Sequence, residues 1–289
     1  MDLRSIVMGV GFAVMWSSAF TSARIIVEAA PPLSALALRF IISGLLGVFI
    51  AWLLGQSWRL TPSQWRACII LGICQNALYL GLNFVAMQTI EASFAVIIAS
   101  MMPLLVALAS WLFLRERLPR PAIMGLMAGF AGVAMVMGTR LSGGVDLYGM
   151  TLCILGTVAL TVATLSVRGA TSGGNFLMVV GLQMLIGGAV LAVVAAFTET
   201  LVIEWSWRLG AAFVWTTLIP GLAATLVWFK LVQRISATRA ATFHFLNPFL
   251  GVAIAALVLG EKLQPTDLIG VAIIMAGILA VQLSRRPKS

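Results

Sequence analysis

The chain has 289 residues, of which 61% are hydrophobic and only 9% are charged, and its mean hydropathy is +1.08. Such a composition cannot present a soluble surface, so a soluble globular protein is excluded and the lipid bilayer is the predicted surrounding. The formal net charge is +9. The basic residues are spread thinly over short connections, without a basic domain, so no nucleic-acid partner is expected.

Apolar segments long enough to cross a bilayer follow one another along almost the whole chain. Roughly 30 Å of hydrocarbon requires about 20 helical residues, and ten segments meet this requirement. Helices are the economical interpretation, because barrel strands would be shorter and would alternate. The predicted fold class is all-α integral membrane, with ten transmembrane helices. They cover approximately Ser5 to Ala23, Leu33 to Leu54, Ala67 to Met87, Ala92 to Leu114, Pro121 to Gly138, Leu147 to Val167, Phe176 to Phe197, Leu209 to Phe229, Ala237 to Leu259 and Thr266 to Leu283.

The first segment has a second interpretation, as a signal peptide. Asp2 and Arg4 precede its apolar stretch, and Thr21-Ser22-Ala23 would tolerate a signal peptidase. The repeat described below needs an opening helix in each half. We therefore expect the first segment to be retained.

The distribution of positive charge predicts the orientation of the helices. With the N-terminus in the cytoplasm, only Arg24, Arg140, Arg208 and Lys262 of the basic loop residues fall outside. By the positive-inside rule, this bias predicts that both termini are cytoplasmic and that the number of helices is even. The expected location is the inner membrane of the cell.

The second half of the chain repeats the first. With a constant offset of 145 residues, the segment Asn83 to Gly138 aligns without a gap on Trp228 to Leu283. This alignment pairs Pro103 with Pro248 and Glu116 with Glu261, among other identities. We predict two five-helix domains, 1–141 and 142–289. Five is an odd number, so the second domain must enter the membrane from the opposite side, as in the inverted repeats of many transporters.

Particular residues of both halves carry a family resemblance. Each half has a Pro inside its fourth helix and an acidic residue at the exit of that helix. The chain resembles the paired EamA domains of the drug/metabolite transporter superfamily, although Arg115 stands where the second copy has Gly260. The resemblance implies a ten-helix carrier, commonly an exporter of amino acids or other metabolites. Its markers are Trp16-Ser17-Ser18, Arg39-Phe40, Pro103 with Glu116, and Pro248 with Gly260-Glu261-Lys262.

The third helix carries the clearest polar stripe. At 100° per residue, Gln75, Asn76, Tyr79 and Asn83 fall within an arc of about 100° on a helix otherwise covered by apolar residues. In lipid, such groups face the interior of the bundle or water. They are therefore candidate substrate-binding residues. The alternative is that they only form hydrogen bonds with neighbouring helices.

The eighth and ninth helices supply the opposite candidate wall. The repeat places Trp228 at the position of Asn83, and the ninth helix carries Phe243, His244 and Asn247 close to Pro248. His244 is the single histidine of the chain, so a role in binding substrate or a proton is one interpretation. A hydrogen-bonding role in packing is the other.

The first and sixth helices open the two repeats, and we expect them near the centre. Trp16 lies too deep for an interfacial belt and could stack on a planar solute. Thr161 belongs to a stripe with Thr157 and Thr164, although threonines also bond to their own helix. Arg39 lies about two turns into the second helix, and we expect a structural role in which its side chain reaches the headgroups.

The acidic residues all lie at helix ends or in loops, so no carboxylate is predicted at the middle of the membrane. This arrangement favours downhill transport or coupling through His244. A pocket lined by aromatic and amide groups suits a small neutral or zwitterionic solute, and amino acids with aromatic or hydrophobic side chains are the leading substrates. Multidrug efflux is the alternative.

A channel and an integral-membrane enzyme are disfavoured, because neither a filter motif nor a catalytic set is present. The three cysteines lie in apolar segments, so no disulfide or metal is predicted, no cofactor is expected, and the protein is expected to act as a monomer.

Overall fold

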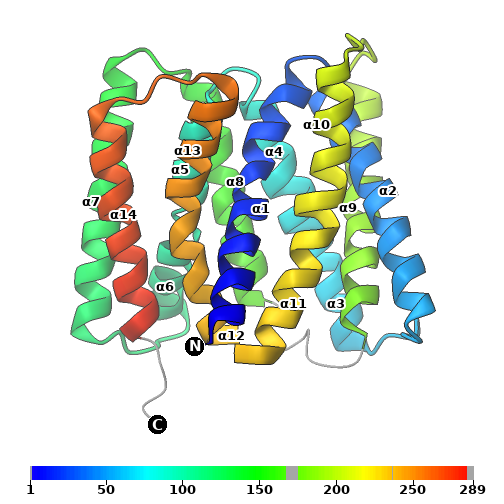
Figure 1. Cartoon of the computed structure of the whole chain (residues 1–289), viewed down its shortest axis with the longest axis horizontal. Helices are drawn as coiled ribbons and strands as arrows, with labels where there is room; N and C mark the ends of the chain where they lie inside the picture. The colour runs from blue at the N-terminus through cyan, green and yellow to red at the C-terminus, as the bar shows by residue number, and fades with distance from the viewer. Residues whose placement is uncertain (1, 167–174, 236, 285–289) are drawn as a thin grey trace. The chain divides into compact units, whose positions relative to one another are not determined.

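The computed structural model describes residues 2–166, 175–235 and 237–284. Over these residues the chain is helical without a strand, and ten helices are long and apolar enough to cross a membrane (Figure 1), which confirms the predicted class and number. The unbroken spans are α1 Leu3–Val27, α2 Pro32–Leu53, α7 Arg120–Ser142, α8 Leu147–Ser166, α9 Phe176–Thr198 and α14 Pro265–Ser284. Span 3 joins α3 Pro62–Ile70, η1 Leu71–Leu80 and α4 Gly81–Ala86, and span 4 joins α5 Ala92–Ala99 and α6 Met102–Phe113. Span 8 joins α10 Trp207–Leu218, η2 Ile219–Ala223 and α11 Ala224–Ile235, and span 9 contains α12 Ala237–Ala241, η3 Thr242–Leu246 and α13 Asn247–Leu259.

The predicted boundaries differ from the structure most at two places, the end of span 8, which lies at Ile235 rather than at Phe229, and the start of span 3. The helix begins at Pro62 rather than at Ala67, because a capping box starts it. The Thr61 side chain accepts from the backbone N–H of Gln64, and the Gln64 side chain accepts from the backbone N–H of Thr61. Proline at the first helical position fits this start, since its missing N–H would have no partner there. The predicted end of the sixth span, Val167, lies outside the described residues.

Four of the spans contain an irregular segment, and these segments occupy matching positions in the two halves. η1 and η2 are π-helical, and with the offset of 145 residues η2 falls within η1. In span 4 a turn at Ser100 and Met101 precedes the helix that carries Pro103. In span 9 the 3₁₀ segment η3 precedes the helix that carries Pro248. π-helical turns are often found at functional sites, so spans 3 and 8 are candidates for contributing to one.

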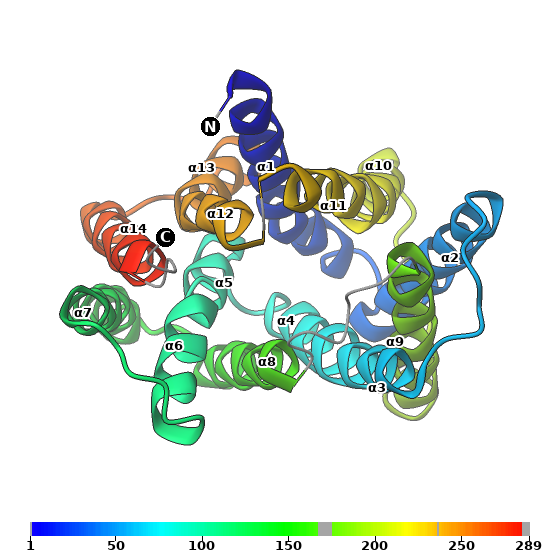
Figure 2. The ribbon, with the colours of Figure 1, turned by 90° about the horizontal axis from the view of Figure 1, so that it is seen from below.

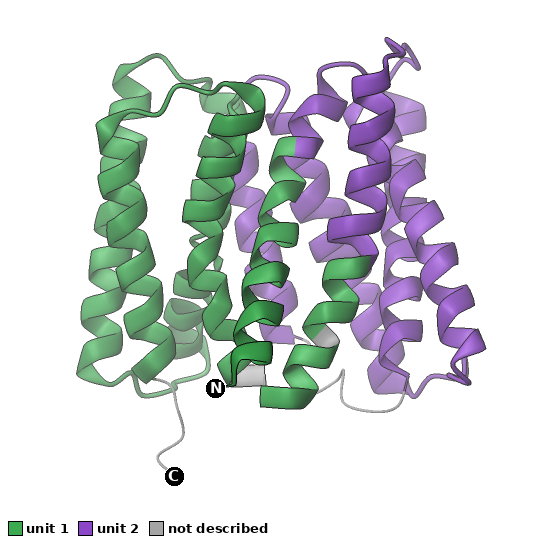
Figure 3. Ribbon diagram, viewed as in Figure 1, with its two compact units in different colours: residues 1–21, 90–150, 223–289 green, residues 22–89, 151–222 purple. Residues whose placement is uncertain are grey.

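The chain divides into two compact units, coloured separately in Figure 3. Unit 1 comprises 1–21, 90–150 and 223–289, and unit 2 comprises 22–89 and 151–222. Each unit takes segments from both halves of the sequence, so the units are a different division from the predicted repeats. The boundary between 141 and 142 stays a prediction.

Glycines bring helices of unit 1 into close contact. α7 and α14 lie side by side (Figure 2), and a Cβ placed on Gly125 would lie 2.7 Å from the carbonyl oxygen of Gly277. A Cβ on Gly132 would lie 3.0 Å from the carbonyl oxygen of Gly270. At an offset of 145 residues, Gly125 corresponds to Gly270 and Gly132 corresponds to Gly277. The contact between Gly125 and Gly277 therefore corresponds to the contact between Gly270 and Gly132.

Unit 2 has the same property. α2 packs along α9 (Figure 2), and a Cβ on Gly44 would lie 3.0 Å from the carbonyl oxygen of Gly181. With an offset of 144 residues this contact becomes the one between Gly188 and Ala37, where the corresponding distance is 3.2 Å. Reciprocal contacts of this kind are required by a two-fold relation between the copies. The inverted placement of the copies in the membrane is consistent with them and remains a prediction.

Candidate functional site

An aromatic cluster formed by Phe12, Trp16, Trp228 and His244 is the most distinctive constellation in unit 1. The His244 ring lies 5.3 Å from the ring of Phe12 and 5.1 Å from that of Trp228, measured between centroids. Trp16 lies edge-on to the His244 ring at 6.3 Å. Phe12 and Trp16 are four residues apart on α1 and therefore share a face of that helix. Three aromatic rings, two from α1 and one from α11, thus lie around the imidazole that η3 provides.

Asn247 connects this cluster to a hydrogen-bonding group. Its side-chain Nδ2 lies 2.9 Å from His244 Nδ1, so Nδ1 accepts and the ring proton is assigned to Nε2. The other amide atom, Oδ1 of Asn247, is buried without a hydrogen-bond partner in the described structure. The backbone oxygen of Asn247 accepts from Ser17 Oγ at 3.4 Å, which links α1 to the start of α13. The cluster therefore contains a buried acceptor that the described protein groups leave unsatisfied.

Phe243 has a different environment from its neighbour His244. Its ring packs with Leu231 and Ala240, and a Cβ on Gly9 would lie 2.3 Å from it. The glycine is therefore needed for the close approach of this ring to α1. Phe243 therefore packs η3, the segment that holds His244, against α1 and α11.

The predicted stripe of span 3 lies in unit 2. Asn76, Tyr79 and Asn83 are buried, whereas Ile73 and Leu78 on the same span are 39% and 44% exposed. The polar face therefore turns toward the interior of the unit rather than toward lipid. Gln75 beside it is partly exposed. η1 is π-helical, so these residues do not follow the 100° spacing on which the stripe was predicted.

Protein groups satisfy the amides of this stripe. Asn76 Nδ2 donates to the backbone oxygen of Gln183 on α9 at 3.0 Å. Asn83 Nδ2 donates to the backbone oxygen of Tyr79 at 2.8 Å, and Asn83 Oδ1 accepts from Cys153 Sγ at 3.3 Å. These contacts fit the alternative interpretation, in which the side chains of the stripe only form hydrogen bonds within and between helices. They leave the predicted role of the stripe in binding substrate as an expectation.

The threonines of α8 bond to their own helix. Thr161 Oγ1 donates to the oxygen of Thr157 at 2.9 Å, and Thr157 Oγ1 donates to that of Cys153 at 2.8 Å. Thr161 is buried. Its hydroxyl proton is therefore engaged, and only its oxygen lone pairs remain for another group.

Arg39 does not reach the membrane surface as expected. Its side chain is 5% exposed, and its Nε has no acceptor among the described residues. The guanidinium approaches span 8, where a Cβ on Gly221 would lie 3.7 Å from Nη2 of Arg39. Sequence reasoning placed this side chain among the headgroups because helix position alone cannot tell a lipid-facing arginine from an inward-facing one.

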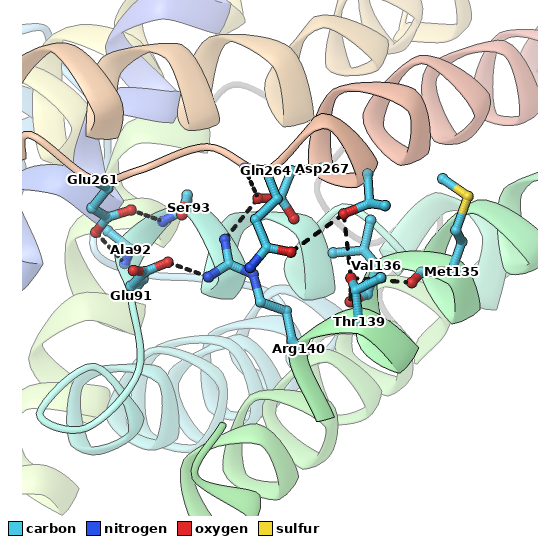
Figure 4. A network of polar contacts seen from close by, with 11 residues as sticks. Glu91, Ala92, Ser93, Met135, Val136, Thr139, Arg140, Glu261, Gln264 and Asp267 are labelled. Atoms are coloured by element: carbon cyan, nitrogen blue, oxygen red, sulfur yellow. Dashed lines mark hydrogen bonds and ion pairs between the residues drawn. The ribbon is translucent and has the colours of Figure 1, made fainter. Parts of the chain in front are cut away.

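A charged network ties the ends of several spans of unit 1 together, as Figure 4 shows. Arg140 on α7 bonds to Glu91 at 2.6 Å and to Asp267 on α14 at 2.8 Å. Glu261, just after α13, accepts the backbone N–H groups of Ala92 and Ser93 at the start of α5. A carboxylate at a helix N-terminus satisfies donors that have no intrahelical partner and complements the helix dipole. The acidic residues that sequence placed at helix ends therefore act as caps and bridges here.

Two contributors were missed or misjudged by sequence reasoning. Phe12 was not singled out, because an apolar residue in an apolar helix gives no compositional signal. Its position four residues before Trp16 was the available indication. Arg140 was counted only as an outside charge, and its pairing with Asp267 needs contacts that are distant in the sequence.

Comparison with known proteins places the whole chain. A family model described as the EamA-like transporter family matches residues 3–138 and 147–283. The uncharacterized transporter YvbV of Bacillus subtilis is 26% identical over 269 residues, covering 93% of this chain and 88% of its own. Protein PecM of Dickeya dadantii is 24% identical, covering 95% and 92%, and the uncharacterized inner membrane transporter YedA of Escherichia coli K12 is 25% identical, covering 94% and 88%. A solved crystal structure superimposes with a TM-score of 0.70 at 22% identity, over the full length of both chains, and shares the fold.

Proposed function

Because the chain belongs to the EamA-like transporter family, we propose that it exports small neutral or zwitterionic metabolites, and above all amino acids with aromatic or hydrophobic side chains. The chain is a membrane transporter with ten apolar spans. It is a multi-pass protein of the inner membrane, as the name of the Escherichia coli relative states for that protein. The substrate, the direction and the alternating-access mechanism are part of the proposal.

The observation that carries the proposal is the pairing of His244 with the unsatisfied Oδ1 of Asn247 inside the aromatic cluster. An amino acid has the complementary groups: its ammonium can donate to Asn247 Oδ1, and its carboxylate can accept from the Nε2–H of His244. An apolar or aromatic side chain would then contact the rings of Trp16 and Trp228. A buried acceptor without a partner costs about 1–3 kcal/mol, and a ligand donor would recover part of that cost.

The remaining predicted residues belong to the proposal as further lining of the pathway. They are Gln75, Asn76, Tyr79, Asn83 and Thr161 of unit 2, and Phe243 as the packing support of His244 in unit 1. Export by alternating access would require the two halves to exchange conformations, as inverted repeats allow.

Counterflow in liposomes tests this function. Liposomes that contain the protein and are loaded with unlabelled L-phenylalanine should take up labelled L-phenylalanine at a rate that saturates with its concentration. A cationic dye should not compete with this uptake. Trp228→Ala should raise the half-saturation concentration by about threefold to tenfold, since one aromatic contact is removed. Trp111→Ala is the matched control, because Trp111 is 49% exposed on α6 and should leave the value unchanged. Exchange of the dye without exchange of any amino acid would instead establish multidrug efflux, and uptake without saturation would indicate a channel.

A further inference from the structure

Unit 2 contains a buried positive charge that the described chain does not neutralise. Arg39 is 5% exposed within α2, and its Nε is a buried donor without an acceptor. No ion pair joins Arg39 to a described carboxylate. Moving an arginine to the interior of a membrane span is costly, and such residues ordinarily pair with an acid or serve a functional site.

The acidic residues of unit 2 are engaged elsewhere or exposed. Glu28 pairs with Arg24 at 2.9 Å. Glu199 accepts from the backbone N–H groups of Leu33 and Ser34 at the start of α2, at 2.7 and 2.8 Å. Glu204, which completes the acids of this unit, is exposed. The counter-charge of Arg39 is therefore not supplied by the carboxylates of the unit that holds it.

The sister copy carries a neutral side chain at the matching position. The counterpart of Arg39, at an offset of 144, is Gln183, and Asn76 donates to the backbone oxygen of Gln183. The counterpart of Asn76, at an offset of 145, is Gly221, which is the residue that faces Arg39. In one copy the Asn76 amide thus bonds to the backbone beside a neutral side chain, whose own Oε1 is buried without a partner among the described residues. In the other copy a guanidinium lies near a glycine, which has no side chain to offer it.

The described neighbourhood of Arg39 includes the ring of Phe40, whose centroid lies 5.1 Å from Cζ of the guanidinium, and the hydroxyl of Ser43. Ser43, one turn further along α2, donates its hydroxyl to the oxygen of Thr217 at 3.2 Å. A Cβ on Gly221 would lie 3.3 Å from Ser43 Oγ, so the glycine allows Ser43 to approach the backbone of span 8 closely. A single guanidinium matches one negative charge and binds a carboxylate with two parallel hydrogen bonds.

We propose that Arg39 is an anion-binding residue that holds a small monovalent anion, either the carboxylate of the transported solute or chloride. The first source rests on the proposed amino-acid substrate but places its carboxylate at Arg39 instead of at His244, whereas the second source leaves the contacts proposed for His244 unchanged. A solute held at Arg39 through its carboxylate would meet one fixed positive charge, so an amine without a carboxylate would be excluded. Chloride would act as a bound counter-ion that stays with the protein while the solute passes.

Thermal unfolding of the purified protein in detergent tests the site. The titrants are L-phenylalanine, 2-phenylethylamine, which lacks the carboxylate, and sodium chloride exchanged for sodium sulfate at constant ionic strength. The midpoint of the wild type should rise with L-phenylalanine or with chloride and should not respond to the amine. Arg39→Gln should lose at least about tenfold in apparent affinity, since the charged hydrogen bonds are removed. Arg39→Lys keeps the charge and should lose less.

Two controls make the outcome decisive. Arg208→Gln removes an exposed positive charge of the same unit and should respond as the wild type does. Without titrant, Arg39→Gln should melt no lower than the wild type, because removing an uncompensated buried charge relieves its desolvation. A chloride response that disappears in Arg39→Gln would support the site even if counterflow detects no amino acid. The proposal is wrong if neither anion stabilises the wild type, if Arg39→Gln keeps the wild-type response, or if Arg39→Gln fails to fold.

Discussion

Gly125 and Gly277 pack backbone against backbone between α7 and α14. A Cβ on Gly277 would lie 2.5 Å from the carbonyl oxygen of Gly125 and 2.7 Å from the backbone nitrogen of Gly129. Backbone atoms cannot move aside as a flexible side chain can, so a methyl group at this position must separate the two helices.

We therefore expect Gly277→Ala to destabilise the protein by about 1–3 kcal/mol, the usual cost of overpacking. Gly138→Ala on α7 is the matched control, because nothing lies within 4 Å of a Cβ placed there. That change should stabilise the helix by up to about 1 kcal/mol through helix propensity. Unfolding midpoints in mild detergent measure both, and equal effects of the two changes would contradict the packing argument.

Arg115 adopts the backbone conformation that glycine adopts in the sister copy. Its φ is +54°, and Gly260 at the matching position has a φ of +71°. A left-handed conformation costs a non-glycine residue roughly 1–2 kcal/mol. Arg115→Gly should therefore stabilise the protein by up to about 1 kcal/mol after the added entropy of the unfolded chain. Gly260→Ala should destabilise it by about 1 kcal/mol, and denaturant titration of the two variants should give opposite signs.

The charged network makes Arg140 more important than an exposed arginine. Asp267, its partner on α14, has a side chain that is 1% exposed. Arg140→Gln would leave this buried carboxylate unpaired and should cost about 3–5 kcal/mol. Asp2→Asn breaks the exposed pair between Asp2 and Arg234 and should leave the unfolding midpoint unchanged. If Arg140→Gln is as mild as Asp2→Asn, then the network contributes little to stability.

The topology prediction concerns two loops that follow matching helices. The loop from Arg115 to Arg120 should lie in the cytoplasm, and the loop from Gly260 to Pro265 should lie outside. Reporter fusions that are active on only one side of the membrane should give opposite signals at these two sites. Fusions at both termini should match the first loop, and matching signals from the two loops would refute the inverted repeat.

The coupling prediction follows from the positions of the acidic residues. Transport in liposomes should run down the substrate gradient alone, and a protonophore should leave the initial rate unchanged within about twofold, since no acid is predicted at the membrane centre to carry a proton. His244→Gln keeps a hydrogen-bonding side chain without titration near neutral pH, so downhill transport should persist. Uphill accumulation driven by a pH gradient, and lost in His244→Gln, would show instead that His244 carries the proton.

Sequence reasoning predicted the fold well because membrane spans are long and almost uniformly apolar. Its errors arise where short-range chemistry decides, as at the start of span 3, where Thr61 and Gln64 extend the helix beyond the apolar segment. For the candidate site, the offset of 145 and helical spacing identified Trp16, Trp228 and His244, which the structure brings together. The orientation of Arg39 could not be predicted, since its inward contacts involve span 8, which is distant in the sequence.

The π-helical segment η1 has a consequence for how span 3 tolerates changes in its length. In a regular α-helix such as α2, deletion of one residue rotates everything beyond it by about 100° and turns buried side chains toward lipid. A π-helical turn holds an additional residue between its hydrogen-bonded groups, so deletion within Leu71–Leu80 can be absorbed by conversion to α-helical bonding. The side chains at both ends of span 3 would then keep their orientation about the helix axis. We therefore expect this chain to tolerate the gain or loss of a single residue in span 3, and in span 8 at η2, better than in its regular helices.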